Sequence, residues 1–277
     1  MTEYITRFAP SPTGNLHIGS ARTALINYII KSKYPNSKFF LRIEDTDKTR
    51  SKEEYKSNII DSLKWLGIRW ENEVQIQSER AKRHLEIANI LLEENNAYKC
   101  NCSTEELNKK REIIKKNKIK QKKICTSCKN NKAVQSLSSN YVIRIKIPEK
   151  GFATINDNIQ GIINTNNEEI DDYILIREDG SPTYMLSVVV DDYDLNINFI
   201  IRGDDHMNNT FRQKFIYEYM NWSLPQYAHL PLINGEDGSK LSKRHGSTNI
   251  LELKDKGYLQ ESIINNLILL GWSPNPT

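Results

Sequence analysis

The stretch of this chain that most restricts its fold is PTGNLHIGS, at residues 12–20. It follows a strand-like run, YITRF at 4–8, and precedes a helical run, ARTALINY at 21–28. A strand, a tight glycine-containing turn and a helix form a phosphate-binding geometry, because backbone N–H groups and the helix N-terminus face the anion. Gly14 and Gly19 let the backbone approach the anion, and His17 stands at the mouth of the helix. The stretch therefore predicts a phosphate site.

Strand and helix patterns alternate on both sides of a different central region. Residues 38–43 predict a strand, SKEE at 51–54 is a capping box that opens a helix, and Gly67 closes that helix. This order is typical of a parallel α/β unit. Residues from about 98 to 180 are polar and mixed, and they read as an insertion. The α/β pattern then returns at 184–202, so one α/β domain split by an insertion is expected.

Composition and charge exclude some classes of protein. The 277 residues are 38% hydrophobic and 27% charged, as in a soluble globular protein. The chain lacks an apolar run of about 20 residues and a secretory signal at its start, so we expect a cytoplasmic protein without a membrane span. The net charge of +4 is only mildly basic.

Basic residues are concentrated in one segment, KKREIIKKNKIKQKK at 109–123. A solvated, lysine-rich surface helix explains this segment as well as a patch that faces RNA phosphates. Both interpretations stay open.

A second motif, KLSKR at 240–244, makes the match to a particular class of phosphate-binding protein specific. With HIGS at 17–20 it resembles the two nucleotide-binding signatures of class I aminoacyl-tRNA synthetases, HIGH and KMSKS. The surrounding text, RFAPSPTG at 7–14, RIEDTD at 42–47 and RGDDH at 202–206, is similar to that of bacterial-type glutamyl-tRNA synthetases. The resemblance covers essentially the whole chain, with the motifs in the family's order.

This resemblance implies a fold and a domain order. The fold is a Rossmann-like parallel sheet of the class I synthetases with an inserted mixed α+β domain that binds the tRNA acceptor end, followed by a helical stem region. The expected boundaries are 1–97 and 181–234 for the two halves of the catalytic domain, 98–180 for the insertion, and 235–277 for the KLSKR loop and the start of the stem. The anticodon-binding domains of the family are missing, so we expect a catalytic-half fragment or a naturally short enzyme.

The resemblance also implies an activity: ATP-dependent ligation of L-glutamate to tRNA(Glu) through glutamyl-adenylate, with Mg²⁺ and a monomeric enzyme. His17 and Lys243 would be catalytic, with Lys240 in support. Gly14, Gly19, Asp205 and His206 would lie with them at the ATP. The implied glutamate-binding residues are Arg7, Ser11, Glu44, Tyr184, Ser187 and Arg202. Among these, the arginines suit the two carboxylates, Glu44 the ammonium group, and Tyr184 a carboxylate. Two other histidines, His84 and His229, are expected to be surface or packing residues.

The cysteines form two close pairs, Cys100 with Cys102 and Cys125 with Cys128. Two such pairs separated by a polar loop suit a tetrahedral, structural zinc ion, and disulfides are not expected in a cytoplasmic protein. Some family members carry zinc in this insertion. The alternative is four free thiols.

Three rival functions stay open. A short paralogue that glutamylates queuosine on tRNA(Asp) also lacks anticodon domains, but it usually differs at the EDTD text of 44–47 and at KLSKR. A glutaminyl enzyme differs around residues 10–12. A non-catalytic RNA-binding relative should have lost His17 or Lys243, and both are present.

Overall fold

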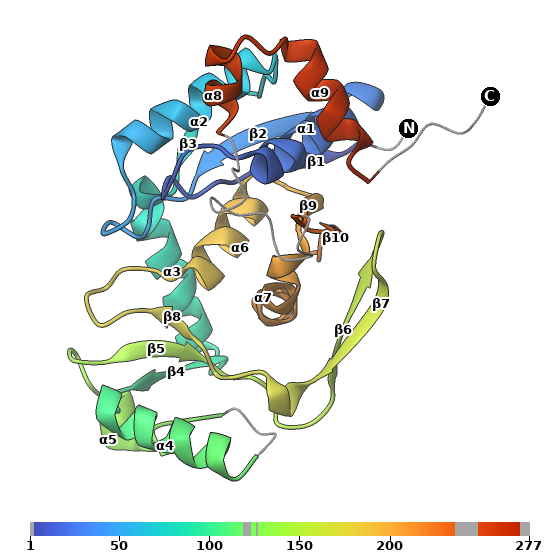
Figure 1. The fold of residues 1–277 in the computed structure, drawn as a ribbon. Helices are drawn as coiled ribbons and strands as arrows, with labels where there is room; N and C mark the ends of the chain where they lie inside the picture. The colour runs from blue at the N-terminus through green and yellow to red at the C-terminus, as the bar shows by residue number, and fades with distance from the viewer. Residues whose placement is uncertain (1–2, 119–122, 126, 236–248, 272–277) are drawn as a thin grey trace.

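The structure is a computed structural model that describes residues 3–118, 123–125, 127–235 and 249–271. Its centre is a parallel sheet (Figure 1). In the first half, β1 (Ile5–Phe8), β2 (Lys38–Ile43) and β3 (Gln75–Ile76) pair in parallel. In the second half, β9 (Phe199–Gly203) pairs in parallel with β10 (Gln226–Leu230).

The two halves meet between β1 and β9. The backbone N–H of Asn198, just before β9, donates to the carbonyl of Ile5 at 3.1 Å. The strand order is therefore β3-β2-β1 beside β9-β10. From β1 the chain adds strands toward one edge of the sheet, and from β9 it adds them toward the other edge, so the switch point lies between β1 and β9. Open parallel sheets bind ligands at such a switch point, beyond the carboxyl ends of the strands.

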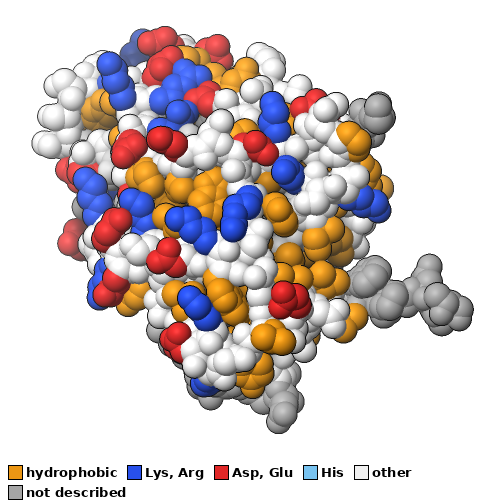
Figure 2. Space-filling view, turned by 90° about the horizontal axis from the view of Figure 1, so that it is seen from above, with side chains coloured by type: hydrophobic (Ala, Val, Ile, Leu, Met, Phe, Trp, Pro, Cys, Tyr) orange, Lys and Arg blue, Asp and Glu red, His pale blue; other side chains and the backbone are white. Residues whose placement is uncertain are grey.

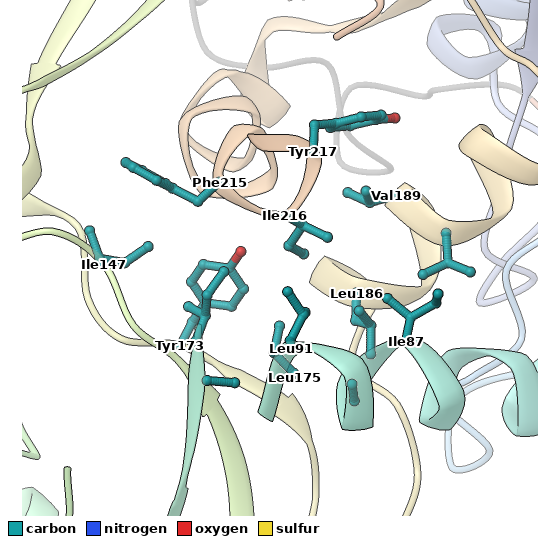
Figure 3. Packing of buried hydrophobic residues seen from close by; sticks show 14 of the residues in the cluster. Ile87, Leu91, Ile147, Tyr173, Leu175, Leu186, Val189, Phe215, Ile216 and Tyr217 are labelled. Atoms are coloured by element: carbon teal, nitrogen blue, oxygen red, sulfur yellow. The ribbon is translucent and has the colours of Figure 1, made fainter. Parts of the chain in front are cut away.

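Alternate residues of the central strands serve two cores. Ile5, Ile200 and Tyr227 pack on one face with α3 (Ala81–Glu93), α6 (Tyr184–Asp194) and α7 (Met207–Tyr219). Phe39 and Leu41 pack on the other face with α1 (Ile18–Lys33), α2 (Glu53–Trp65), α8 (Ile250–Asp255) and α9 (Gln260–Leu269). Figure 3 shows side chains of α3, α6 and α7 meeting in the first core. Helices cover both faces, which confirms the Rossmann-like α/β class.

Two sequence predictions about α2 had different outcomes. The capping box at Ser51 is wrong: the helix N-cap is Lys52, and no side chain caps this end. Gly67 does end the helix, with a φ of 70° that favours glycine. Asparagines take the same left-handed conformation after α3, α6 and α7, at Asn95, Asn196 and Asn221.

The region between the two halves contributes to two sheets. An antiparallel sheet is formed by β4 (Ala97–Cys100), β5 (Val142–Ile145) and β8 (Ile174–Ile176), next to α4 (Thr104–Lys116) and α5 (Lys132–Gln135). The hairpin of β6 (Phe152–Asp157) and β7 (Gly161–Asn166) instead joins the central sheet, where Asp157 pairs with Tyr227 of β10. One strand of the expected insertion at 98–180, β6, thus pairs directly with the central sheet.

The surface gives limited information about partners. The basic segment begins in α4, which is capped by Ser103 and Glu106 and exposes Lys109 and Arg111. An RNA contact there stays a prediction. Figure 2 shows basic and acidic side chains interspersed over another face. In the part of the chain that the structure describes, no helix has the length and apolar character needed to cross a membrane.

Candidate active site

A cavity of about 880 Å³ lies at the switch point of the sheet. Its walls come from the turn after β1, the start of α1, the turn after β9 and the segment after β10. Ten residues predicted for the site line this cavity: Arg7, Ser11, Gly14, His17, Gly19, Glu44, Tyr184, Arg202, Asp205 and His206. Lys240 and Lys243 lie outside the described residues.

His17 is the N-cap of α1. Its Nδ1 accepts hydrogen bonds from the backbone N–H groups of Gly19 at 3.1 Å and Ser20 at 3.3 Å. A neutral ring that accepts at Nδ1 carries its proton on Nε2, and this nitrogen lies 3.1 Å from the Ser20 hydroxyl. Gly19 allows this arrangement, since a Cβ there would lie 3.1 Å from the His17 ring. His17 thus caps α1 through Nδ1 and faces Ser20 through Nε2.

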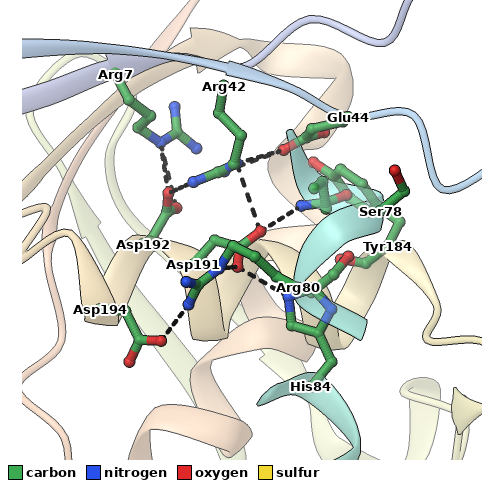
Figure 4. Close-up of polar contacts among 12 residues, drawn as sticks. Arg7, Arg42, Glu44, Ser78, Arg80, His84, Tyr184, Asp191, Asp192 and Asp194 are labelled. Atoms are coloured by element: carbon green, nitrogen blue, oxygen red, sulfur yellow. Dashed lines mark hydrogen bonds and ion pairs between the residues drawn. The ribbon is translucent and has the colours of Figure 1, made fainter. Parts of the chain in front are cut away.

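Arg7 reaches the cavity from β1 and is held from behind. Its Nε donates to Asp192 of α6 at 3.0 Å, and the same carboxylate accepts from Nη1 of Arg42 at 2.7 Å (Figure 4). Arg42 is fully buried on β2, and its Nη2 donates to Glu44 at 3.0 Å. Within the described residues, the terminal nitrogens of Arg7 make no hydrogen bond, so they can donate to a ligand.

Glu44 is a buried carboxylate on the cavity wall, with 5% of its surface exposed. Burial raises its pKa, and the neighbouring cations Arg42 and Arg7 offset this only in part. An ammonium group in the cavity would supply the missing compensation. The position fits the ammonium-binding role expected from the sequence.

Arg202 reaches the cavity from β9. Its Nη2 donates to Thr210 Oγ1 at 2.6 Å and to Gln213 Oε1 at 3.0 Å, and its Nε donates to Nε2 of His229 at 3.2 Å. Nη1 is buried and has no hydrogen-bond partner within the described ranges. A buried donor without a partner is costly, so the geometry fits an anion bound at Nη1.

Two predicted residues are engaged differently from expectation. The Tyr184 hydroxyl bonds Nδ1 of His206 at 3.1 Å, and the amide of Asn209 donates to the same nitrogen at 3.2 Å. Burial, together with Arg202, lowers the pKa of His206 to about 4, so the ring is neutral and the tyrosine is its donor. Ser187 does not line the cavity: it is fully buried, and its hydroxyl donates to the carbonyl of Thr183, because it faces its own helix.

Sequence reasoning missed the buried charges behind the cavity. Of the surface or packing positions expected for His84 and His229, the structure shows buried packing positions, in which the two rings are bonded to carboxylates, Asp191 and Asp157 respectively. A signal was available: His84 lies on the apolar face of α3 with Ile87, Ala88 and Leu91. A polar residue at a core position usually has a buried partner.

The cysteines converge in the inserted region. The sulfurs of Cys100, Cys102, Cys125 and Cys128 lie within 4.8 Å of one another, and three of the pairs are at 3.5 Å. A tetrahedral zinc ion with Zn–S bonds of about 2.3 Å requires sulfurs about 3.8 Å apart. The thiols form no disulfide. The donor set and its geometry fit a structural zinc ion, with no position open for a reactive water.

The comparison with protein families decides the assignment. A family model described as tRNA synthetases class I (E and Q), catalytic domain, matches residues 3–277. The chain belongs to this family. The class I synthetase fold expected from HIGS and KLSKR is thereby confirmed.

Named members of the class I synthetases cover nearly all of the chain. "Glutamate--tRNA ligase 1" of Ehrlichia canis (strain Jake) is 49% identical over 98% of this chain and 57% of that protein. "Glutamate--tRNA ligase 2" of Rickettsia prowazekii (strain Madrid E) is 51% identical over 99% of this chain and 58% of that protein. A crystal structure of a glutamate tRNA ligase from Elizabethkingia meningosepticum has a TM-score of 0.86 at 31% identity, over 99% of this chain and 62% of that one. The chain thus spans under two thirds of these relatives.

Proposed function

We propose that this chain activates L-glutamate with ATP and transfers it to the acceptor end of tRNA(Glu). One observation carries the proposal: one cavity is lined both by the N-terminus of α1 and by Arg7, Arg202 and Glu44. A helix N-terminus suits phosphates. Two arginines and one carboxylate match the charges of a dicarboxylic amino acid.

The amino-acid half of the cavity would work by charge complementarity. Arg7 and Arg202 offer donors to the two carboxylates, and Glu44 accepts from the ammonium group. Glutamine or aspartate would leave buried donors unpaired or out of reach. Polar pockets of this type discriminate strongly without editing.

In the ATP half, an α-carboxylate oxygen of glutamate attacks the α-phosphorus while the bond to the β-phosphate breaks and pyrophosphate leaves. Nε2–H of His17 would stabilise the charge on the phosphates once an anion takes the place of the Ser20 hydroxyl, and the positive end of the α1 dipole would add to this. Lys240 and Lys243 would act on the leaving pyrophosphate, and Asp205 would lie near the adenosine. Mg²⁺, when bound with ATP, would supply further neutralisation of the phosphates.

In the second step, the 2′-hydroxyl of the terminal tRNA adenosine attacks the glutamyl carbonyl and AMP leaves. The inserted region would hold the acceptor end. Its cysteines would hold zinc, which would fix the loops around α4 and α5 and take no part in the reaction.

Pyrophosphate exchange in the presence of tRNA tests the proposal. We expect exchange that depends on glutamate and not on glutamine or aspartate, and charging of tRNA(Glu) in preference to a queuosine-bearing tRNA(Asp). Preference for the latter would favour the paralogue. No exchange with any amino acid would contradict the enzyme function.

The guanidinium group of Arg202 gives a sharper test. Arg202→Lys should lower kcat/KM for glutamate about 100-fold, because a buried charged pair loses its geometry, with little change in KM for ATP. Arg212→Lys is the matched control: Arg212 makes a half-exposed pair with Asp171 at 2.9 Å, away from the cavity. The control should stay within about twofold of wild type.

Zinc is tested by metal analysis of the purified chain. We expect about one zinc per chain, and Cys102→Ser should lose the metal and destabilise the inserted region. A folded, metal-free wild-type protein would support four free thiols.

A further inference from the structure

A buried aspartate–histidine pair lies behind Arg202, and no residue of the pair lines the cavity. We propose that Asp157 and His229 are positioning residues that hold the Arg202 guanidinium in place for a substrate carboxylate. The inference rests on the proposed function of the cavity as an amino-acid site. It adds two residues from strands β6 and β10 to that site.

The carboxylate of Asp157 is fixed by many donors. It accepts from Nδ1 of His229 at 2.6 Å, from the backbone N–H of His229 at 3.1 Å, and from the N–H groups of Ile159 and Gln160 at 2.9 Å each. Burial opposes its charge, but these bonds outweigh burial and leave its pKa below the usual value. An ionised Asp157 therefore fixes the proton of the imidazole on Nδ1.

The tautomer determines what His229 can do for Arg202. With the proton on Nδ1, Nε2 is an acceptor, and it receives Nε–H of Arg202 at 3.2 Å. It also receives the Thr210 hydroxyl at 2.9 Å, and that hydroxyl accepts from Nη2 of Arg202 at 2.6 Å. Arg202, Thr210 and His229 thus form a closed ring of hydrogen bonds.

This ring orients the guanidinium. Nε and Nη2 are engaged, and the remaining Nη1 is the donor without a partner among the described residues. His229 is neutral, because burial and the charge of Arg202 lower its pKa. A neutral support leaves the positive charge of Arg202 available to a ligand, whereas a carboxylate in direct contact would neutralise it.

A purely structural role for the pair makes different predictions. Among the described residues, His84 is also a buried histidine: it bonds Asp191 at 2.8 Å and has no hydrogen bond there to an arginine that lines the cavity. It is the matched control, because its loss removes an equivalent buried pair. A packing role predicts equal effects of the two histidines on glutamate binding.

The first measurement is the tautomer, read from the ¹⁵N spectrum of the histidine rings of the full chain, with the His229→Gln variant assigning the signals. We expect a neutral His229 with its proton on Nδ1 from pH 6 to 8. A proton on Nε2 would overturn the proposal, because that nitrogen could not accept from Arg202. This result does not depend on any activity.

The second measurement separates KM from kcat. His229→Leu removes the acceptor and should raise KM for glutamate about 10- to 100-fold, with kcat and KM for ATP within about threefold. His229→Gln keeps an acceptor and should recover most of the loss, and His84→Gln should leave KM for glutamate unchanged. An unchanged KM in His229→Leu, or equal losses for both histidines, would overturn the inference.

The outcomes separate the inference from the proposed function. A wild-type chain without glutamate-dependent exchange contradicts the function, while the tautomer still decides the arrangement around Arg202. A wild-type chain that uses glutamate, with a His229→Leu variant that is unaffected, contradicts only the inference. If His229→Leu does not fold, the tautomer of His229 in the wild-type chain decides.

Discussion

The two arginines of the cavity are held in different ways. Arg7 is bonded directly to a carboxylate, Asp192, which it shares with the fully buried Arg42. Arg202 is bonded to a neutral imidazole, and its carboxylate, Asp157, lies on the far side of that ring. Both supports act through Nε. They leave the terminal nitrogens of Arg7 and Nη1 of Arg202 for a ligand.

The difference teaches how a buried cation can serve either stability or binding. Around Arg7, the charges of Asp192 and Arg42 compensate each other, so this cluster can be satisfied before any substrate binds. Around Arg202, one donor stays without a partner among the described residues. We therefore expect loss of the Asp192 carboxylate to affect mainly folding, and changes near Arg202 to affect mainly glutamate binding.

The largest expected effect is on stability. Asp192→Asn leaves two buried guanidinium groups without their shared anion and should lower the free energy of unfolding by about 3–5 kcal/mol at pH 7. Burial alone would raise the pKa of Asp192, but Arg42 and Arg7 bring it below its usual value. The stabilisation is therefore present above pH about 4 and is lost as the pH falls through the lower, folded-state pKa.

Urea unfolding at several pH values checks this prediction. Asp61→Asn, on the exposed face of α2, is the control and should change stability by less than about 0.5 kcal/mol. If Asp192→Asn were as stable as wild type, the Arg7 cluster would not be the folding element described above.

How much of this the sequence could predict depends on how local the signal is. The turn at 12–20 was predictable from a short motif with its own geometry, and the split α/β fold from the order of strand and helix patterns. The two cavity arginines were predictable from the resemblance to the family. Asp192 and Asp157 were not, because their partners are 185 and 72 residues away. In β6 the only signal is that Asp157 continues the buried alternation of Ala153 and Ile155.

Ser187 shows the opposite limit. A motif position indicates where a serine lies along a helix, but not which acceptor its hydroxyl group bonds. The Ser187 hydroxyl bonds the preceding turn, as serines within helices commonly do.

An intermediate effect is expected at Glu44, where stability and function should separate. Burial raises its pKa above the value in the unfolded chain, so ionisation of Glu44 costs stability as the pH rises through the folded-state pKa, and lowering the pH removes that cost. Glu44→Gln should therefore leave stability at pH 7 unchanged within about 0.5 kcal/mol or raise it. It should raise KM for glutamate about 10-fold or more, since the ammonium group loses its anion.

Unfolding and exchange kinetics measured on the same sample test this separation. Glu93→Gln, exposed at the end of α3, is the control for both measurements. A strongly destabilised Glu44→Gln with a normal KM would mean that Glu44 serves Arg42 and not the ligand.

The smallest effect is expected at Thr210, whose hydroxyl closes the ring around Arg202. Thr210→Val keeps the shape of the side chain and removes that hydroxyl, but Gln213 still accepts from Nη2 and His229 still accepts from Nε. Losing one of several bonds should cost about 1 kcal/mol, a rise of about 5-fold in KM for glutamate. Thr154→Val, on the exposed side of β6, is the control and should not change this KM. A change in Thr210→Val as large as that in His229→Leu would place the orienting role on the hydroxyl, because the imidazole would then reach Arg202 only through it.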